Sequence, residues 1–596
     1  MGSSLPEQPA HDIVDVMPPA KAPADGGSAN ATVAEAATLS SRTLVWARRL
    51  WLRFKPRPGW RLGHALYRVA LAGAGLAGVV LALRATVPHY YRVISAYDEG
   101  VLLTNAHLLL RGELPYRDFY SNYPPGIFAL LAGWFAVFGQ SVAVERWLGL
   151  TLHFTVATLA GRVAGRALGG RFSLVVCGLV ACWLVPLRLP PYAWLAALSL
   201  ALLACELWAR AQALGRSLGY VLVGVTLGAI SWFRHDLFLY FSAVSAGFGL
   251  AWVVIERWRG RRAEFFSRGS PLHGVFHVAG GALAALLLLW VPVFAVAGAS
   301  RVAHDLYLDQ VHYTMPARVL PMPSLTTLSS APWSPFALPA FLREPFPGSV
   351  LLTLVGPVLA LGALLWPRGA GLTHYRSMLL PAALTIAVLP QLLGRTDIAH
   401  SVFAVTPALI ASAVWLIGGP ERRWNAGRAW GLLLLGVALL FVPLRETLAA
   451  TKNLKLQDLR AELSRPSITP MAPDRQRALA FVWRHTGKGD PIYVGLTDHR
   501  WTHHNDMALY FLADRIGATR YMQFDPNLTN REDVQRSMIE ELERTRPKVA
   551  LLAPSKRSNE PNESRNAGSS VLDRYMRTHY KEEGRAGALR LLLRRP

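Results

Sequence analysis

The residues best suited to chemistry begin with two adjacent acids, Asp98 and Glu99, directly after the first long apolar segment. Arg117 and Asp118 follow in the same stretch and are expected to form a local ion pair. Two tyrosines there suit a membrane interface or a sugar-stacking surface: Tyr120 and Tyr123. Ionisable groups near membrane depth are costly and tend to be functional. We therefore predict that this stretch is functional and that Arg117, Tyr120 and Tyr123 contribute to substrate binding, the alternative being an ordinary solvated loop.

A second cluster, Arg234-His235-Asp236, lies between two apolar segments with almost no loop. Three ionisable residues in so tight a turn indicate a cavity rather than bulk water. The alternative is that they cap two helices and extend their charged ends to the surface.

A third cluster contains Arg395, Asp397 and His400. Asp397 and His400 are three residues apart, so they can face the same site on a helix. A weaker set lies in a Pro-rich stretch and supplies further candidates for substrate binding: Asp305, Asp309, His312 and Tyr313.

These residue types allow three kinds of chemistry, and their pattern does not choose among them. A carboxylate can act as general base on an acceptor hydroxyl or amine. Arginine and histidine can bind a phosphate leaving group. Aspartate and histidine together can hold a divalent metal ion such as Mg²⁺ or Mn²⁺.

The elements that must position these residues are apolar helices. Of the 596 residues, 52% are hydrophobic, and they gather in long blocks separated by short Arg-rich or Pro-rich breaks. About twenty apolar residues span a bilayer core of roughly 30 Å. Segments that qualify or nearly qualify are 66–83, 146–165, 172–187, 193–209, 218–233, 237–255, 275–298, 349–366, 377–393, 400–417 and 429–444.

The formal net charge of +24 would fit nucleic-acid binding, but the position of the arginines argues against it. Arg-rich gaps recur at every second break, within 162–171, 210–216, 257–268, 368–376 and 422–428. Cytoplasmic loops carry such an excess. We therefore expect an integral protein of the plasma (inner) membrane, with a cytoplasmic N-terminus, an extracytoplasmic C-terminus and all the polar clusters on the outer face.

The apolar stretch 124–139 tests this topology. A full span there would invert every later segment and separate Asp98 from the other clusters, so the arginine pattern favours a re-entrant or interfacial helix. The stretch 98–111 is amphipathic and is expected to lie along the membrane surface. The outer loop at about 299–348 contains many prolines and is expected to be a lid or binding loop.

We expect four parts along the chain: a disordered cytoplasmic tail (1–43), a transmembrane catalytic domain (44–447), a linker (448–471) and a soluble extracytoplasmic α/β domain (472–596). In the last part, helices at 474–486, 531–545 and 569–580 alternate with strands at 492–496, 549–553 and 589–594. The predicted fold class is mainly α: a polytopic transmembrane bundle of about eleven spans plus interfacial helices, with a small C-terminal α/β domain.

The chain resembles the GT-C superfamily of membrane glycosyltransferases, in particular protein O-mannosyltransferases, aminoarabinose transferases and galacturonosyltransferases. The resemblance covers about residues 60–445 and is most specific in the first outer loop. Its residues are Asp98-Glu99, an amphipathic helix, Gly112 to Tyr116, Tyr123-Pro124-Pro125-Gly126, Gly139 and Arg146. The resemblance implies that Asp98 is the catalytic base, with Glu99 beside it as a second catalytic candidate. It also implies that the donor is a polyprenyl-phosphate sugar whose phosphate is held by basic residues.

Two departures from the family pattern bear on the substrates. Tyr123 stands where the aminoarabinose transferases commonly have Lys, so Arg234 or Arg395 would have to bind the phosphate. The next outer loop lacks the second acid of those relatives, and Asp236 would replace it. A divalent metal is possible, with Asp98, Asp236 and His235 as ligands.

The sequence thus predicts an inverting hexosyl- or pentosyltransferase that acts on a lipid, glycan or protein acceptor, with membrane lipids and no nucleic acid as further partners. A transporter or flippase of lipid-linked sugars is an alternative. So is a non-catalytic scaffold in envelope assembly.

Overall fold

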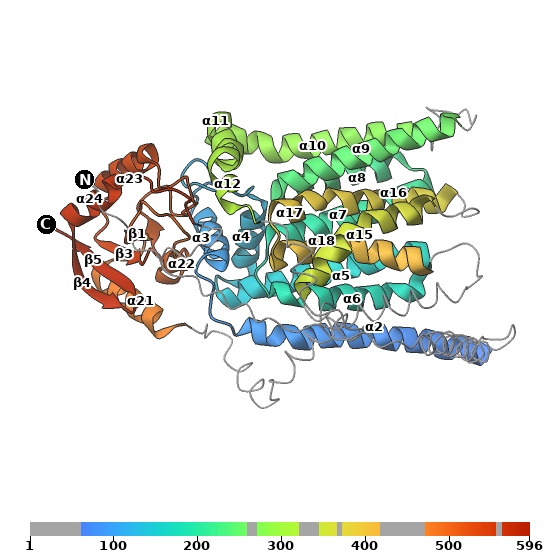
Figure 1. Cartoon of the computed structure of the whole chain (residues 1–596), viewed down its shortest axis with the longest axis horizontal. Helices are drawn as coiled ribbons and strands as arrows, with labels where there is room; N and C mark the ends of the chain where they lie inside the picture. Colours follow the sequence, from blue (N-terminus) through green and yellow to red (C-terminus); the bar gives the residue numbers. More distant parts are fainter. Residues whose placement is uncertain (1–60, 259–270, 321–344, 366–371, 418–470, 556–562) are drawn as a thin grey trace, which may run out of the picture.

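A computed structural model describes residues 61–258, 271–320, 345–365, 372–417, 471–555 and 563–596. The chain is mainly helical, with a small sheet domain at one end of a helical bundle (Figure 1). The predicted tail at 1–43, the segment 429–444 and nearly all of the 448–471 linker lie outside the described residues, and so does the part 321–344 of the Pro-rich loop.

Ten of the eleven predicted apolar segments correspond to helices, because long apolar runs without polar interruptions favour buried or lipid-facing helix. Their bounds are α2 Arg61–Tyr90, α5 Val142–Leu168, α6 Ser173–Leu184, α7 Ala193–Leu214, α8 Ser217–Phe233, α9 His235–Trp258, α10 Pro271–Ala297, α15 Pro345–Leu365, α16 Leu372–Ala387 with α17 Leu389–Gly394, and α18 Ile398–Ile417.

Membrane-spanning length is clear for fewer of these helices. Within the described residues, three are long and apolar enough to cross a bilayer: Val69–Tyr90, Ala193–Leu214 and Gly274–Ala297. A fourth span results if the bent pair α4 and α5 is counted as one. The helices are those of a membrane protein, and the predicted number of about eleven spans stays a prediction.

The first loop forms two short helices, α3 (Asp98–Leu110) and α4 (Gly126–Phe138). α4 has 13 residues, so it is about 20 Å long and too short for the bilayer core. It meets α5 at an angle of 119°. Both short helices lie at the end of the bundle beside the sheet domain (Figure 1). This geometry fits the predicted re-entrant or interfacial segment at 124–139.

The Pro-rich stretch begins as short helical pieces rather than as an extended loop. α11 (Ala299–Ala303) leads through two π-helical turns, His304–Leu308 and Gln310–Thr314, into α12 (Met315–Arg318). Leu320 then forms a parallel bridge with Arg395. This bridge brings the end of α12 beside the turn between α17 and α18.

The C-terminal domain is a five-stranded mixed sheet in the order β2-β1-β3-β5-β4. Its strands are β1 Pro491–Leu496, β2 Ile516–Gly517, β3 Val549–Ala553, β4 Tyr580–Ala586 and β5 Leu589–Arg594, and its helices are α21 Pro473–His485, α22 Ala508–Ala513, α23 Glu532–Thr545 and α24 Val571–His579. β1 pairs in parallel with β2 and β3, and β5 pairs antiparallel with β3 and β4. The predicted helices and strands are all present, within about three residues at their ends.

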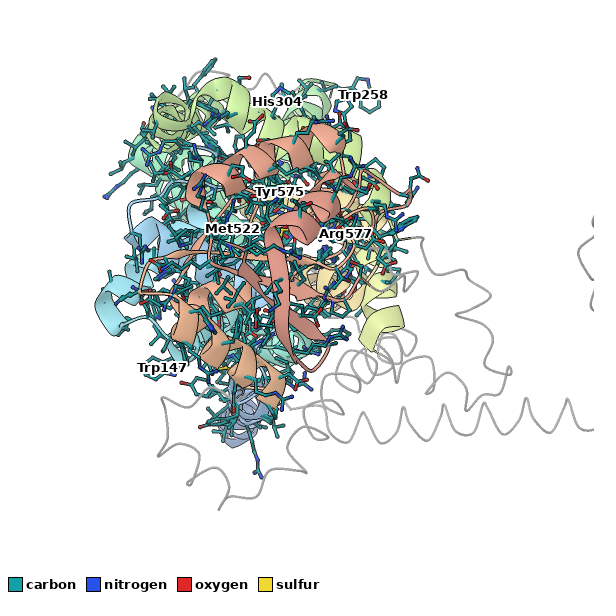
Figure 2. All side chains as sticks on the ribbon, turned by 90° about the vertical axis from the view of Figure 1, so that its left-hand side faces the viewer. Trp147, Trp258, His304, Met522, Tyr575 and Arg577 are labelled. Carbon is teal, nitrogen blue, oxygen red and sulfur yellow. The ribbon has the colours of Figure 1, made fainter. Side chains whose placement is uncertain are left out.

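The domain is docked directly on the first loop, and Figure 2 shows it in front of the bundle when the molecule is seen from that end. A Cβ atom on Gly100 would lie 2.5 Å from the backbone nitrogen of Ala508, so only glycine permits this approach. Thr104 Oγ1 donates to the Met507 carbonyl at 2.8 Å, and the Tyr120 amide donates to the Arg520 carbonyl at 2.9 Å. The C-terminal domain therefore covers the loop that carries Asp98.

Candidate functional site

Asp98 is the first residue of α3, where a carboxylate is favoured by the partial positive charge of the helix N-terminus. Its side chain is exposed to water, yet burial is the largest influence on its pKa, which it raises. Among the described residues it has no ion-pair partner, which leaves it free to accept a proton.

Two arginines and a histidine lie close enough to lower the pKa of Asp98 against this burial: Arg318, Arg395 and His400. Arg318 ends α12, and the other two flank the N-terminus of α18. The structure thus brings Asp98 together with the third cluster, although about 300 residues separate them. It also adds Arg318, which the sequence did not single out.

The third cluster is a compact network. Asp397 Oδ1 accepts from the His400 backbone amide at 2.9 Å, which caps the first turn of α18. The same oxygen lies 2.7 Å from His400 Nδ1, and Arg395 Nε donates to Oδ2 at 2.7 Å. Asp397 therefore orients both Arg395 and His400, and its contact with His400 is the one expected from the three-residue spacing.

The second cluster is also built around an ion pair. Arg234 Nε donates to Asp236 Oδ1 at 2.9 Å, and its Nη2 donates to Gln391 of α17 at 3.1 Å. The guanidinium lies 4.6 Å from the centre of the Trp194 ring. These contacts hold Arg234 at the N-terminal ends of α7 and α9, on the side of the bundle that carries Arg395 and His400.

The N-termini of α3, α9 and α18 therefore meet in one region, together with arginines from three segments. Helix N-termini and guanidinium groups both favour anions. The arrangement suits a phosphate group beside an unpaired carboxylate.

The C-terminal domain supplies a further part of this region. Asp525 is fully buried and accepts hydrogen bonds from Tyr97 at 3.0 Å and from Tyr120 at 2.9 Å. Arg318 lies 3.9 Å from the same carboxylate. The His504 ring stacks on Tyr97 with centroids 3.5 Å apart.

Glu99 differs from its neighbour Asp98 in every contact. Its Oε1 accepts from Arg146 Nε at 2.8 Å and its Oε2 accepts from the Ser95 amide at 2.7 Å. The side chains of Glu99 and Arg146 are 5% and 2% exposed. This carboxylate is fully engaged, so its contacts support a structural role rather than the predicted part in catalysis.

The other predicted substrate-binding residues fall into two groups. Tyr123 lies within electrostatic range of Arg318 and Arg234, at the site. Arg117 pairs with Asp118 at 2.6 Å, as predicted, and none of its contacts within the described ranges joins it to Asp98.

The weaker set of the Pro-rich stretch contacts the C-terminal domain. His312 is exposed, with its Nδ1 2.8 Å from the Leu308 carbonyl. Tyr313 packs under Arg531, 4.0 Å from the ring centre. Arg520 Nη2 donates to Asp305 Oδ2 at 2.6 Å, and burial raises the pKa of Asp305 to about 6. These contacts support docking of the two regions rather than substrate binding.

The predicted metal ligands do not form a metal-binding set. Asp236 is paired with Arg234, and the His235 ring packs against Tyr307 with centroids 4.6 Å apart. In the part of the chain that the structure describes, no three His, Cys, Asp or Glu side chains gather as ligands. The charges nearest to Asp98 are mostly cationic, which disfavours a divalent cation there.

Three residues of the site were missed at the level of sequence: Arg318, His504 and Asp525. Arg318 lies in the first half of the Pro-rich stretch without a neighbouring charged residue, and the other two lie in a domain without a recognisable motif. No local pattern marks them, because each is brought to the site by the packing of distant segments.

Comparison with solved structures identifies the fold. The apo structure of ArnT from Cupriavidus metallidurans matches with a TM-score of 0.50 and 13% identity, over 88% of this chain and 98% of that one. ArnT bound to undecaprenyl phosphate gives 0.47 and 13%, over 89% and 98%. The Archaeoglobus fulgidus oligosaccharyltransferase, tethered with an acceptor peptide, gives 0.46 and 11%, over 82% and 69%.

Scans against protein-family models and against curated proteins gave no match. The likeness to apo ArnT shows that this chain has the GT-C fold of membrane glycosyltransferases. The resemblance predicted from the first outer loop is thereby confirmed at the level of the fold.

Proposed function

We propose that this chain is a membrane glycosyltransferase that moves a sugar from a polyprenyl phosphate to a lipid, glycan or protein acceptor. The observation that carries the proposal is the Asp98 carboxylate, which has no ion-pair partner among the described residues and lies within electrostatic range of Arg318, Arg395 and His400. A base beside a phosphate-binding surface is what transfer from a phosphate-linked donor requires.

In the proposed reaction, the Asp98 carboxylate accepts the proton of an acceptor hydroxyl or amine. The freed electron pair attacks the anomeric carbon of the donor, and the bond from that carbon to the phosphate oxygen breaks. The electrons of that bond remain on the polyprenyl phosphate, whose added negative charge is stabilised by Arg318, Arg395 and Arg234. A single displacement of this kind inverts the anomeric configuration.

Asp397 and Asp236 act as positioning residues in this scheme. Each pairs with one arginine, Arg395 and Arg234 respectively, and holds its guanidinium toward the site. Bidentate or paired guanidinium groups lose less conformational entropy on binding a phosphate because they are already ordered. No step of the scheme uses a metal ion, since the donor set near Asp98 does not fit one.

We place the site on the extracytoplasmic face. The arginines at 162, 166 and 210 lie toward the C-terminal ends of α5 and α7, whereas Arg146 of α5 and Trp194 of α7 lie at the end of the bundle that carries the site. Arginines gather on the cytoplasmic side of membrane proteins. The clustering of the polar residues at one end, rather than along a path through the bundle, favours an enzyme over a transporter.

The test is Asp98→Asn, with Asp118→Asn as the matched control. Asp118 is an aspartate of the same loop whose partner is the partly exposed Arg117. Cells that lack the chain are complemented with wild type or either variant, and their envelope glycans are compared by mass spectrometry. Loss of a general base reduces the rate by roughly 10²- to 10⁴-fold. The sugar-dependent mass difference should therefore vanish with Asp98→Asn and persist with Asp118→Asn.

Purified protein in detergent gives the second measurement, since it removes any membrane gradient. Release of undecaprenyl phosphate from undecaprenyl-phosphate sugars should depend on wild-type protein and on Asp98. Full transfer by Asp98→Asn would rule out its role as the base. Movement of lipid-linked sugars in vesicles, without transfer in detergent, would instead support the transporter alternative.

A further inference from the structure

The side chains around Asp525 come from the first loop and α12 as well as from the C-terminal domain. Its carboxylate is fully buried, and burial raises its pKa, whereas Arg318 and the hydroxyls of Tyr120 and Tyr97 lower it. The two tyrosines belong to the first loop and the arginine to α12. Among the described residues of the same domain, Gln523 is the one side chain that donates to this carboxylate, from Nε2 at 3.3 Å. A buried charge is costly unless it is compensated, and here most of the compensation crosses the boundary between domain and bundle.

Two of the groups that Asp525 contacts, Tyr97 and Arg318, also lie near Asp98. Tyr97 precedes Asp98 in the chain and is the N-cap residue of α3. It is held by the hydrogen bond to Asp525, by a second one from Gln523 Nε2 at 2.9 Å and by stacking on His504. Arg318 lies 3.9 Å from the Asp525 carboxylate and within electrostatic range of Asp98.

We propose that Asp525 is a positioning residue of the transfer reaction. By fixing Arg318 and Tyr97, it keeps the phosphate-binding arginine and the start of α3 in the geometry that the Asp98 site needs. The C-terminal domain is then a working part of the active site rather than an appended module. This inference rests on the proposed function, because it assigns to Arg318 a contact with the donor phosphate.

A second buried aspartate of the same domain provides a matched control. Asp573 lies 2.6 Å from Nδ1 of His499 and also accepts from the His499 backbone amide. Both residues are buried within the C-terminal domain, and neither contacts the first loop or α12 among the described contacts. Asp573→Asn therefore perturbs the interior of the domain without touching Arg318.

The experiment measures binding of undecaprenyl phosphate to the full chain in detergent, from the rise in melting temperature as the lipid is added. The variants are Asp525→Asn, Arg318→Gln, the double variant and Asp573→Asn. Loss of an oriented charged contact weakens affinity by roughly tenfold. We expect this loss for Asp525→Asn and for Arg318→Gln, and wild-type affinity for Asp573→Asn.

The double variant separates positioning from a general loss of stability. If Asp525 acts through Arg318, the double variant binds no more weakly than Arg318→Gln, because neighbours in one network are not additive. Independent, additive losses would overturn the proposal, and so would an affinity of Asp525→Asn close to that of wild type. If wild-type protein itself binds no undecaprenyl phosphate, the proposed function fails first.

Tyr97→Phe is a second variant that tests the proposal if Asp525→Asn does not fold. It retains the ring that stacks on His504 and removes the hydroxyl that donates to Asp525. We expect binding of undecaprenyl phosphate to weaken severalfold in this variant. Unchanged binding in Tyr97→Phe would overturn the proposal by itself.

Discussion

The two ends of the bundle each contain an acid among arginines, but they use them differently. At one end, Glu206 of α7 is 4% exposed and is surrounded by Arg162, Arg166 and Arg210, with nitrogen–oxygen distances of 3.1, 2.7 and 3.0 Å. At the other end, Arg318 and Arg395 are paired with Asp525 and Asp397, and Asp98 has no ion-pair partner in the part of the chain that the structure describes.

The difference shows why an acid among arginines does not by itself mark a catalytic site. The Glu206 carboxylate has as many donors as it can use, so a ligand would have to displace an arginine. Asp98 keeps an open carboxylate, while Asp397 and Asp525 hold the cations around it in place. A free acid beside cations that are already oriented is an arrangement that favours chemistry.

The largest expected effect is on the rate of transfer, which should differ between Arg318→Gln at the Asp98 end and Arg210→Gln at the Glu206 end. Transfer should fall by roughly 10- to 100-fold in Arg318→Gln, because a charged contact to the donor phosphate is lost. Arg210 is half exposed at the Glu206 end, and its loss should change transfer by less than about twofold. Initial rates with undecaprenyl-phosphate sugars give the measurement, and equal losses at the two ends would break the comparison.

A smaller effect is expected in the pH dependence of transfer. A general base must be ionised, so the rate falls as the pH decreases through the pKa of Asp98. Burial raises that pKa, so the decline should begin at a higher pH than for an exposed aspartate. Arg318 lowers the same pKa, so Arg318→Gln should move the acid limb to higher pH.

The measurement for this prediction is kcat/KM as a function of pH for wild type, Arg318→Gln and Glu206→Gln. The Glu206 variant serves as the control, because its carboxylate lies near the far end of the bundle, and its acid limb should coincide with that of wild type. A limb that moves to lower pH in Arg318→Gln would contradict the placement of Arg318 beside Asp98.

The smallest effect on transfer is expected for Glu206→Gln. Three arginines would then face one another without the acid, which costs about 1–2 kcal/mol of stability; the cost is limited because the arginines reach solvent. The melting temperature in detergent should fall while transfer stays within about twofold of wild type. A loss of transfer at an unchanged melting temperature would assign a functional role to Glu206.

Much of the helical framework could be predicted because it depends on local composition. Apolar runs identified ten helices, and the hydrophobic strands β1, β3 and β5 were expected near their observed positions. β4 was missed, since Tyr580–Ala586 is rich in charged residues, as suits an edge strand that faces solvent. β2 has only two residues and offers no pattern to detect.

The candidate site could be predicted only in part, and Asp98 and Glu99 illustrate the limit. As neighbours in the chain they have the same local signal, so both were expected to be catalytic. Because they point to different sides of α3, one carboxylate is enclosed by Arg146 while the other opens toward Arg318 and Arg395. Only three-dimensional packing separates the two roles.

The sequence by itself determined which segments are helices and which short polar clusters interrupt them, because hydrophobicity and charge act locally along the chain. The tertiary structure decided which clusters meet. Tyr97 and Asp525 are joined across 428 residues, and Arg318 reaches Asp98 only where α12 folds back beside α18. Contacts of this kind follow from the packing of distant segments, for which the sequence carries no local signal.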